Sequence, residues 1–394
     1  MNFWFIVAAS LLFAGALLQY SLIRLLLPKR LSTATSIIIA SAATLIINAI
    51  PLLYMGTEPI LDQLPWWHRH LVIFPYAIFM VTSISCGLIC LVVFFTRSTV
   101  AKPSPHFDTD RRDFLRNTAR VLTAASLGAL TYGAYCENGL PEISRIALPY
   151  SRLHPDLCGL RIVQITDIHA GPFISFESIA ATVSMVNALK PDLILLTGDY
   201  INNNPAYVDG CLRLLDGLRA PCGVFGVYGN HDYYTGIRVV RDAFAKTHIT
   251  MLNDSTSTPK GLEGLLNIIG VNDPVSGIAT DAEFRDPARI SRLVAPGQLN
   301  LLLSHRPGIF KICKDWKVDL TLAGHTHGGQ VIVPMVGTRG LSLAGLFFTY
   351  THGLYHAESD PEIRMYVNRG IGTIGAPVRL FCDPEIAEIT LTRG

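Results

Sequence analysis

The sequence lacks the cysteine and charge patterns that mark several common classes of protein. Its eight cysteines are irregularly spaced and form no C-x-x-C pair, which argues against a structural zinc site or a dithiol redox site. The formal net charge is only +2, and the part after about Ser151 has no stripe of lysine and arginine interleaved with aromatic residues. A nucleic-acid-binding protein is therefore disfavoured, and no nucleic-acid partner is expected.

Charged residues are also scarce in the first third of the chain. The mean hydropathy of +0.36 is high for a soluble protein. Three stretches reach the length of about 20 apolar residues that a bilayer core requires, namely Phe3–Leu27, Ala34–Met55 and Leu71–Phe95. We therefore predict a membrane region over residues 1–140 with three to four transmembrane helices. The mixed composition of residues 150–394 predicts a separate globular domain.

The basic residues predict how this membrane region is oriented. Lysines and arginines follow the first and third stretches, whereas the loop after the second has only Arg69 besides histidines. By the positive-inside rule, the first and third loops are cytoplasmic. We therefore expect a multi-pass protein of the cell membrane.

A fourth, weaker apolar run, Val121–Tyr135, decides the side on which the C-terminal domain lies. It follows the string Arg111-Arg112-Asp113-Phe114-Leu115-Arg116, which resembles a twin-arginine export signal. A plain basic anchor is the alternative. If the run crosses the membrane the domain lies outside, as we expect, and if it does not the domain is cytoplasmic.

The C-terminal part alternates short β-rich runs with amphipathic helical patterns, as α/β proteins do. The expected strands are Arg161–Thr166, Leu193–Thr197, Val224–Tyr228, Leu299–Ser304 and Leu320–Ala323. The expected helices are Phe176–Leu189, Val208–Leu218 and Ile237–Lys246.

A cluster of polar side chains follows each of these five expected strands. In chain order the clusters are Asp167-Ile168-His169, Gly198-Asp199, Gly229-Asn230-His231-Asp232, His305 and Gly324-His325-Thr326-His327. Any one of them is common by chance, and a lone histidine is more often a hydrogen-bonded structural residue. Five in order, at the strand ends where open α/β sheets bind ligands, predict a site. Carboxylates and imidazoles with one amide and no thiolate suit Mn²⁺, Fe²⁺ or Zn²⁺.

This ordered set of residues resembles the calcineurin-like metallophosphoesterase superfamily over about residues 160–390. The stretches 325–330 and 367–372, with Pro377-Val378-Arg379, are similar to its bacterial membrane-anchored or exported phosphodiesterases. The resemblance implies an α/β fold, a four-layer α-β-β-α sandwich of two β-sheets covered by helices. Protein Ser/Thr phosphatases of the superfamily continue Gly-Asp into Asp-Arg-Gly. Here Gly198-Asp199 continues into residues 200–204, Tyr-Ile-Asn-Asn-Asn, so a phosphoprotein phosphatase is disfavoured.

The resemblance also implies a role for each residue of the set. The first metal ion would be held by Asp167, His169, Asp199 and His327, and the second by the shared Asp199 with Asn230, His305 and His325. His231 would stabilise the phosphoryl group and protonate the leaving oxygen, and Asp232 would orient His231. The cofactors would be two divalent ions, with Mn²⁺ preferred over Fe²⁺ or Zn²⁺. Two such ions about 3.5–4 Å apart can activate water and clamp phosphoryl oxygens.

We therefore expect a metal-dependent phosphoric ester hydrolase. Its substrate would carry a phosphodiester, phosphomonoester or pyrophosphate bond and would be membrane-associated or extracytoplasmic. A nuclease is one alternative, and a non-catalytic metal-dependent scaffold or sensor coupled to the membrane helices is another. A scaffold would need the metals at most, so the presence of His231 beside every expected ligand favours the enzyme.

Overall fold

The computed structural model divides into two compact units, Met1–Tyr135 and Cys136–Gly394. The residues that the structure describes are 15–21, 23–24, 27, 30–54, 71–72, 74–76, 78–80, 82–83, 108–135, 139–273, 287–313, 316–336 and 339–394.

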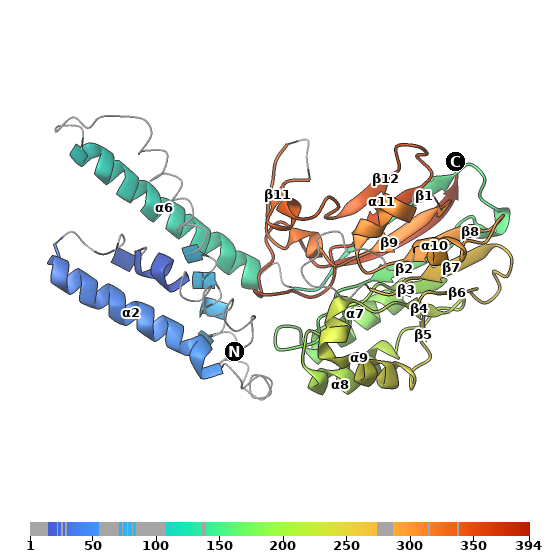
Figure 1. Cartoon of the computed structure of the whole chain (residues 1–394), viewed down its shortest axis with the longest axis horizontal. Coiled ribbons are helices and arrows are strands. Elements are labelled where there is room, and N and C mark those ends of the chain that lie inside the picture. The colour runs from blue at the N-terminus through green and yellow to red at the C-terminus, as the bar shows by residue number, and fades with distance from the viewer. Residues whose placement is uncertain are drawn as a thin grey trace. The chain divides into compact units, whose positions relative to one another are not determined.

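The N-terminal unit contains two long helices, α2 (Thr33–Tyr54) and α6 (Asp108–Tyr135) (Figure 1). Helix α2 covers most of the second apolar stretch, and Ser41, Thr44 and Asn48 interrupt its apolar sequence. Helix α6 is longer, but its first half is rich in aspartate and arginine. The fourth apolar run forms the second half of this same helix rather than a separate element.

The prediction of a transmembrane region is wrong by this structure. Within the described residues, no helix combines the length and the apolar character needed to cross a membrane. In α6 the charged first half opposes burial in hydrocarbon. Most of the first and third stretches, Phe3–Leu27 and Leu71–Phe95, lies outside the described residues. The multi-pass location in the cell membrane, which depends on these spans, is corrected with them.

Two six-stranded sheets form the C-terminal unit. The first has the order β1 (Glu142–Tyr150), β14 (Glu385–Arg393), β2 (Arg161–Ile165), β3 (Leu193–Leu196), β4 (Val224–Gly226) and β5 (Thr250–Met251). The second has the order β12 (Gly353–His356), β13 (Arg364–Val367), β9 (Leu320–Ala323), β8 (Leu299–Leu303), β7 (Leu266–Gly270) and β6 (Ser255–Ser257). Strands β2 to β5 are parallel, and so are β13, β9, β8 and β7. A small antiparallel pair, β10 (Ile332–Val333) and β11 (Leu341–Ser342), stands apart.

Helices follow many of these strands. The α-helices of this unit are α7 (Phe176–Ala188), α8 (Val208–Leu215), α9 (Asn230–Phe244), α10 (Pro287–Ser291) and α11 (Phe310–Cys313). Short 3₁₀ turns are η2 (Pro155–Leu157), η3 (Pro205–Tyr207), η4 (Pro307–Ile309), η5 (His327–Gly329) and η6 (Ala344–Leu346). The start of α7 is capped by the Ser175 hydroxyl, which accepts the backbone N–H of Ser178 at 3.2 Å.

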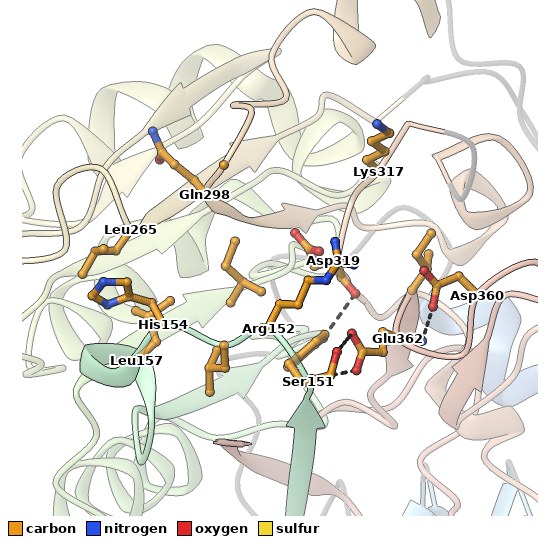
Figure 2. Close-up of a pocket in the computed structure, with 15 residues that line it drawn as sticks. Ser151, Arg152, His154, Leu157, Leu265, Gln298, Lys317, Asp319, Asp360 and Glu362 are labelled. Carbon is orange, nitrogen blue, oxygen red and sulfur yellow. Dashed lines mark hydrogen bonds between the residues drawn. The ribbon is translucent and has the colours of Figure 1, made fainter. Parts of the chain in front are cut away.

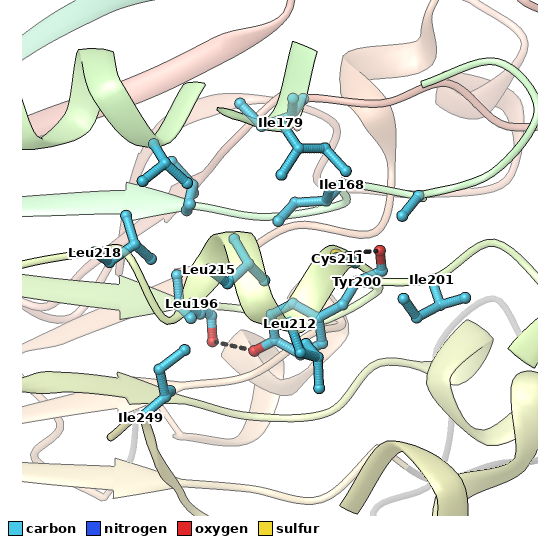
Figure 3. Close-up of a cluster of buried hydrophobic side chains, with 14 of the residues drawn as sticks. Ile168, Ile179, Leu196, Tyr200, Ile201, Cys211, Leu212, Leu215, Leu218 and Ile249 are labelled. Atoms are coloured by element: carbon cyan, nitrogen blue, oxygen red, sulfur yellow. Dashed lines mark hydrogen bonds between the residues drawn. The ribbon is translucent and has the colours of Figure 1, made fainter. Parts of the chain in front are cut away.

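Three hydrophobic clusters define the layers of this unit. One lies between the sheets and takes side chains from both, such as Leu195 and Leu301. A second packs the outer face of the first sheet against α7, α8 and α9 and includes Leu196 (Figure 3). The third packs the outer face of the second sheet against α10 and α11. Because alternate strand residues face opposite sides, neighbours such as Leu195 and Leu196 join different clusters. The result is the expected α-β-β-α sandwich.

The five expected strands are confirmed to within two residues at their carboxyl ends. Helix α9 differs, since it begins at Asn230 rather than near Ile237. Its N-cap is Gly229, and Gly236 interrupts the helix with a φ of 114°. The hydrophobic periodicity of residues 237–246 marks only the part after this kink. The first turn is polar because it carries Asn230, His231 and Asp232.

A cavity of about 720 Å³ lies at the amino ends of the second sheet (Figure 2). Leu299 begins β8, Asp319 immediately precedes β9, and Ile363 immediately precedes β13, and all three line the cavity. The expected ligands follow the carboxyl ends of β8 and β9. This cavity and the expected site are therefore at opposite ends of the sheet.

Candidate metal centre

The residues expected to bind metal come together where the carboxyl ends of the two sheets meet. The first sheet supplies them after β2, β3 and β4, and the second sheet supplies them after β8 and β9. Three groups within the described part of the chain have ligand atoms within 4.8 Å of one another. They are Asp167-His169-His327, Asp199-His305-His325, and His169-Asp199-His231.

The first group joins the β2 and β9 ends. The Nε2 atom of His327 lies 3.1 Å from the Nε2 atom of His169 and 3.5 Å from Oδ1 of Asp167. All three side chains are buried. Two imidazole nitrogens that face each other at this distance need a cation or a proton between them. A divalent ion fits this arrangement of one carboxylate and two imidazoles.

The second group joins the β3, β8 and β9 ends. The Nε2 atom of His305 lies 3.1 Å from Oδ2 of Asp199 and 3.1 Å from Nδ1 of His325. The same Oδ2 atom of Asp199 lies 3.5 Å from Nε2 of His169 in the first group. Asp199 is therefore the carboxylate that faces both groups.

Asn230 supplies an independent test of the fit to a metal ion. Its Oδ1 atom is buried and has no hydrogen-bond partner among the described residues. A buried amide oxygen without a partner is costly. Coordination to a cation would satisfy it, and amide oxygens are suitable ligands for hard divalent ions.

The histidine tautomers are set by backbone carbonyls, which can only accept hydrogen bonds. Nδ1 of His305 is 2.8 Å from the Thr197 carbonyl, and Nδ1 of His327 is 3.2 Å from the Gly372 carbonyl. Each Nδ1 must therefore carry a proton, so Nε2 is the nitrogen that can bind a metal ion once the imidazole is neutral. The sequence gives no sign of the role of these two carbonyls, because residue type does not reveal the contacts of backbone atoms.

The backbone at the metal centre is held in an uncommon conformation. Five expected ligands have positive φ angles although they are not glycine. They are Asp167 (51°), His169 (49°), Asp199 (57°), His325 (72°) and His327 (51°). Such angles cost on the order of 1–3 kcal/mol each and persist where the surrounding structure enforces them. Because these angles are concentrated at the metal centre, we infer that the fold tolerates a loss of stability in order to direct these side chains inward.

Two glycines make room for the carboxylates of Asp199 and Asp167, because they have no side chain. A Cβ atom on Gly229 would lie 2.2 Å from Oδ1 of Asp199, and one on Gly324 would lie 2.2 Å from Oδ2 of Asp167. Neither contact is possible between real atoms. The glycines that precede the Asn-His-Asp and His-Thr-His clusters are therefore required for close approach.

Asp232 contacts the backbone rather than His231. Its carboxylate accepts the N–H groups of Gly229 at 2.9 Å and of Asp199 and Tyr200 at 3.0 Å each. The expected contact with the His231 ring is not found among the described residues. Asp232 instead holds the turn that carries Asp199 against the start of α9.

The ring of His231 is fixed by residues 202 and 203. Its Nδ1 atom lies 2.6 Å from the Asn202 carbonyl and 3.0 Å from Oδ1 of Asn203. The ring packs edge-on against His169 at a centroid distance of 4.6 Å. Its backbone N–H donates to Oδ1 of Asp199 at 2.8 Å. His231 therefore borders both ligand groups from the first turn of α9.

Burial keeps most of these imidazoles neutral. It lowers the pKa of His169 to about 3 and lowers the pKa values of His325 and His327 well below the usual range. A neutral imidazole is the form that binds a metal ion.

Asp199 and His305 behave as a charged pair. Burial would raise the pKa of Asp199, but His305 and His169 hold it well below its usual range. Burial would lower the pKa of His305, but the carboxylates of Asp199 and Asp167 raise it to about 10. Burial, with the charge of Asp199, raises the pKa of Asp167 to about 6. The centre thus holds buried negative charge that favours a cation.

Comparison with known proteins agrees with this site. Residues 160–329 match the family model described as calcineurin-like phosphoesterase. The chain is 32% identical to the uncharacterized metallophosphoesterase YkuE of Bacillus subtilis over 288 residues, and this match covers 71% of this chain and 97% of YkuE. It is 29% identical to the phosphodiesterase YaeI of Escherichia coli over 289 residues, and this match covers 71% of this chain and 98% of YaeI. A solved structure, the NAD nucleotidase of Haemophilus influenzae, shares 15% identity at a TM-score of 0.38, covering 54% of this chain and 45% of that one, which is too distant to support an argument.

The chain belongs to the calcineurin-like metallophosphoesterase family. It is a phosphoric ester hydrolase, and its clustered aspartate and histidine side chains suit a divalent metal centre.

Proposed function

We propose that this protein is a binuclear metal-dependent phosphodiesterase. The observation that carries the proposal is the position of Asp199, whose Oδ2 atom faces His305 at 3.1 Å and His169 at 3.5 Å. One carboxylate between two groups of ligands is the arrangement that two neighbouring cations require. A diester is preferred over a monoester or pyrophosphate because the similar protein YaeI is called a phosphodiesterase.

The ligands divide between two ions in this proposal. Asp167, His169, Asp199 and His327 hold the first, and Asp199, Asn230, His305 and His325 hold the second. The donor set contains no thiolate, so Mn²⁺ is the preferred ion, with Fe²⁺ and Zn²⁺ as alternatives. Bound divalent ions supply Lewis acidity, which lowers the pKa of water and neutralises phosphoryl oxygens.

His231 has the chemical role in this proposal. The Asn202 carbonyl accepts its Nδ1 proton, so the ring is held with Nε2 as its free nitrogen. As the imidazolium, with a second proton on Nε2, His231 can donate a hydrogen bond from that atom to a phosphoryl oxygen and then pass this proton to the leaving oxygen. Asp232 positions the Asp199 turn through backbone amides and does not touch the substrate.

Hydrolysis of bis(p-nitrophenyl) phosphate by the purified full-length protein tests the proposal. Activity should be lost after treatment with a chelator and regained on addition of Mn²⁺. p-Nitrophenyl phosphate, assayed in parallel, should be hydrolysed more slowly if the diester preference is right. Equal activity of chelated and Mn²⁺-loaded protein, with the metal content measured in both, would refute metal dependence.

A further inference from the structure

Arg379 is a fully buried arginine to which the proposed function gives no role. Its exposed fraction is 0%, and among the described residues it has no ion pair with a carboxylate. Burial lowers its pKa. Burying a charge without an acidic partner is expensive unless other groups compensate it. The hydrogen-bond partners of the guanidinium should therefore show which groups its charge stabilises.

The guanidinium of Arg379 gathers backbone carbonyls of one loop, residues 369–372. Its Nη2 atom donates to the carbonyl oxygens of Arg369 at 2.9 Å, Gly370 at 3.1 Å and Gly372 at 2.5 Å. Its Nη1 atom donates to the carbonyl of Cys382 at 3.0 Å. Three carbonyl oxygens that converge on one point repel one another unless a cation lies between them. The 369–372 loop therefore depends on Arg379 for its shape.

The same loop contacts the first group of ligands. The Gly372 carbonyl accepts the Nδ1 proton of His327 at 3.2 Å, and the Gly372 N–H donates to the carbonyl of Asp167 at 2.6 Å. A Cβ atom on Gly370 would lie 2.7 Å from Cβ of Asp167, so the loop and this ligand are in direct contact. Any movement of the loop would therefore shift both His327 and Asp167.

We propose that Arg379 is a positioning residue for the first metal ion. It fixes the Gly372 carbonyl, and this carbonyl in turn fixes the ring of His327 with Nε2 directed at Asp167 and His169. The inference rests on the proposed ligand role of His327. Groups that orient a metal-binding histidine in this way typically change metal affinity by about 10–100-fold when they are removed.

The alternative is that Arg379 supports only folding, and Arg364 offers a matched control for it. Arg364 is also mostly buried and also collects backbone carbonyls, since its Nε donates to Pro361 at 3.0 Å and its Nη1 to Pro149 at 2.6 Å. It begins β13, at the end of the sheet opposite to the proposed ligands. Replacing it removes two hydrogen bonds to backbone carbonyls, against four for Arg379, without touching the 369–372 loop.

The experiment compares Mn²⁺ binding by the full-length wild type and four variants. They are Arg379→Met, Arg379→Lys, Arg364→Met and His327→Ala. Isothermal titration of the metal-free proteins gives the affinity of each Mn²⁺ ion, and urea unfolding of the same metal-free proteins gives their stability. Arg379→Met should weaken one of the two Mn²⁺ ions by about 10–100-fold, and Arg379→Lys should weaken it less, because an ammonium retains the charge but cannot reach all four carbonyls. Arg364→Met should lose stability with unchanged Mn²⁺ affinity.

Three outcomes would overturn the inference. One is a folded Arg379→Met protein with wild-type affinity for both ions, and if that variant does not fold, wild-type affinity of Arg379→Lys has the same weight. Another is equal weakening of Mn²⁺ binding by Arg364→Met, which would make the effect one of general stability. The last is wild-type Mn²⁺ affinity of His327→Ala. This result would show that His327 is not a ligand, and the role of Arg379 in positioning it would then fail as well.

Discussion

His231 borders the metal centre but is held by the carbonyl of Asn202 and the amide of Asn203. This geometry predicts that its side chain serves the reaction more than it serves metal binding. His231→Ala should retain close to the wild-type metal content while turnover falls by about 10²–10⁴-fold, the usual worth of general acid catalysis. Elemental analysis and steady-state kinetics of the same preparation check this.

A surface histidine supplies the control for this prediction. His248 pairs with Asp216 at 2.7 Å, away from the ligand groups, and is partly exposed. His248→Ala should change neither metal content nor turnover. Loss of both metal ions from His231→Ala would assign the residue to the ligands instead.

The order of residue types predicts which side chains meet at the centre, but not the partner of each one. Asp232 follows His231 in sequence, so the two were natural candidates for a hydrogen-bonded pair. On the first turn of a helix, however, neighbouring residues point about 100° apart. Asp232 therefore faces the amides of Gly229, Asp199 and Tyr200, whereas His231 faces the ligand groups. Two of the three partners of Asp232, Asp199 and Tyr200, follow β3, and the sequence does not reveal this contact.

Among the elements, the strands that end in ligands were predictable because each is a short apolar run with a polar cluster at its end. The outer strands were harder. β1 and β14 pair in parallel over nine residues from opposite ends of the unit. No local pattern indicates that pairing, since it depends on how the whole sandwich closes. The start of α9 was missed for a local reason, because its polar first turn and the break at Gly236 hide the helical period.

The amino end of β9 carries a carboxylate whose burial should cost stability. Asp319 lines the cavity of Figure 2 and accepts the backbone N–H of Asn300 at 2.7 Å. Burial, with the nearby charges of Glu362 and Asp360, raises its pKa from 3.8 to about 6 despite that hydrogen bond. A raised carboxyl pKa means that folding favours the protonated form. The protonated Asp319 side chain therefore favours the folded protein fully below about pH 4, and this advantage is lost as the pH rises through about 6.

Asp319→Asn should accordingly stabilise the protein at neutral pH. The amide keeps an oxygen for the Asn300 N–H and carries no charge. We expect the free energy of unfolding to rise by about 1–3 kcal/mol at pH 7, with the gain vanishing near pH 4. Urea unfolding of wild type and variant at pH 4, 5, 6 and 7 measures it.

The corresponding carboxylate of the first sheet is the control for this prediction. Asp192 accepts the N–H of Arg161 at 2.8 Å just before β3, but it also pairs with the Arg161 side chain at 3.8 Å. Asp192→Asn should give no gain at pH 7. A stability difference between Asp319→Asn and wild type that does not depend on pH would contradict the assignment of the effect to Asp319.

At the scale of the whole molecule, the two units differ in how well composition predicts them. The C-terminal unit follows from its strand pattern and its motifs, because buried strands and ligand turns constrain one another. In the N-terminal unit, apolar composition alone predicts spanning helices, and the described helices do not meet that expectation. Apolar content measures only the tendency to leave water. It does not specify which residues form one continuous helix.

The proposed metal centre joins both sheets around two ions that share one carboxylate. Asp199 follows β3 of the first sheet, and its Oδ2 atom lies 3.1 Å from Nε2 of His305, which follows β8 of the second. An amide at this position cannot offset the repulsion between two neighbouring dications. Asp199→Asn should therefore weaken both ions, whereas His169→Ala should weaken mainly the first and Asn230→Ala mainly the second.

Metal stoichiometry of these three variants and the wild type, measured by elemental analysis across a Mn²⁺ titration, is the most direct test. We expect two ions for the wild type, about one for His169→Ala and for Asn230→Ala at limiting Mn²⁺, and close to none for Asp199→Asn. Hydrolysis of bis(p-nitrophenyl) phosphate should fall with the loss of metal. Two ions and near-normal turnover in Asp199→Asn at limiting Mn²⁺ would contradict the shared role of this carboxylate.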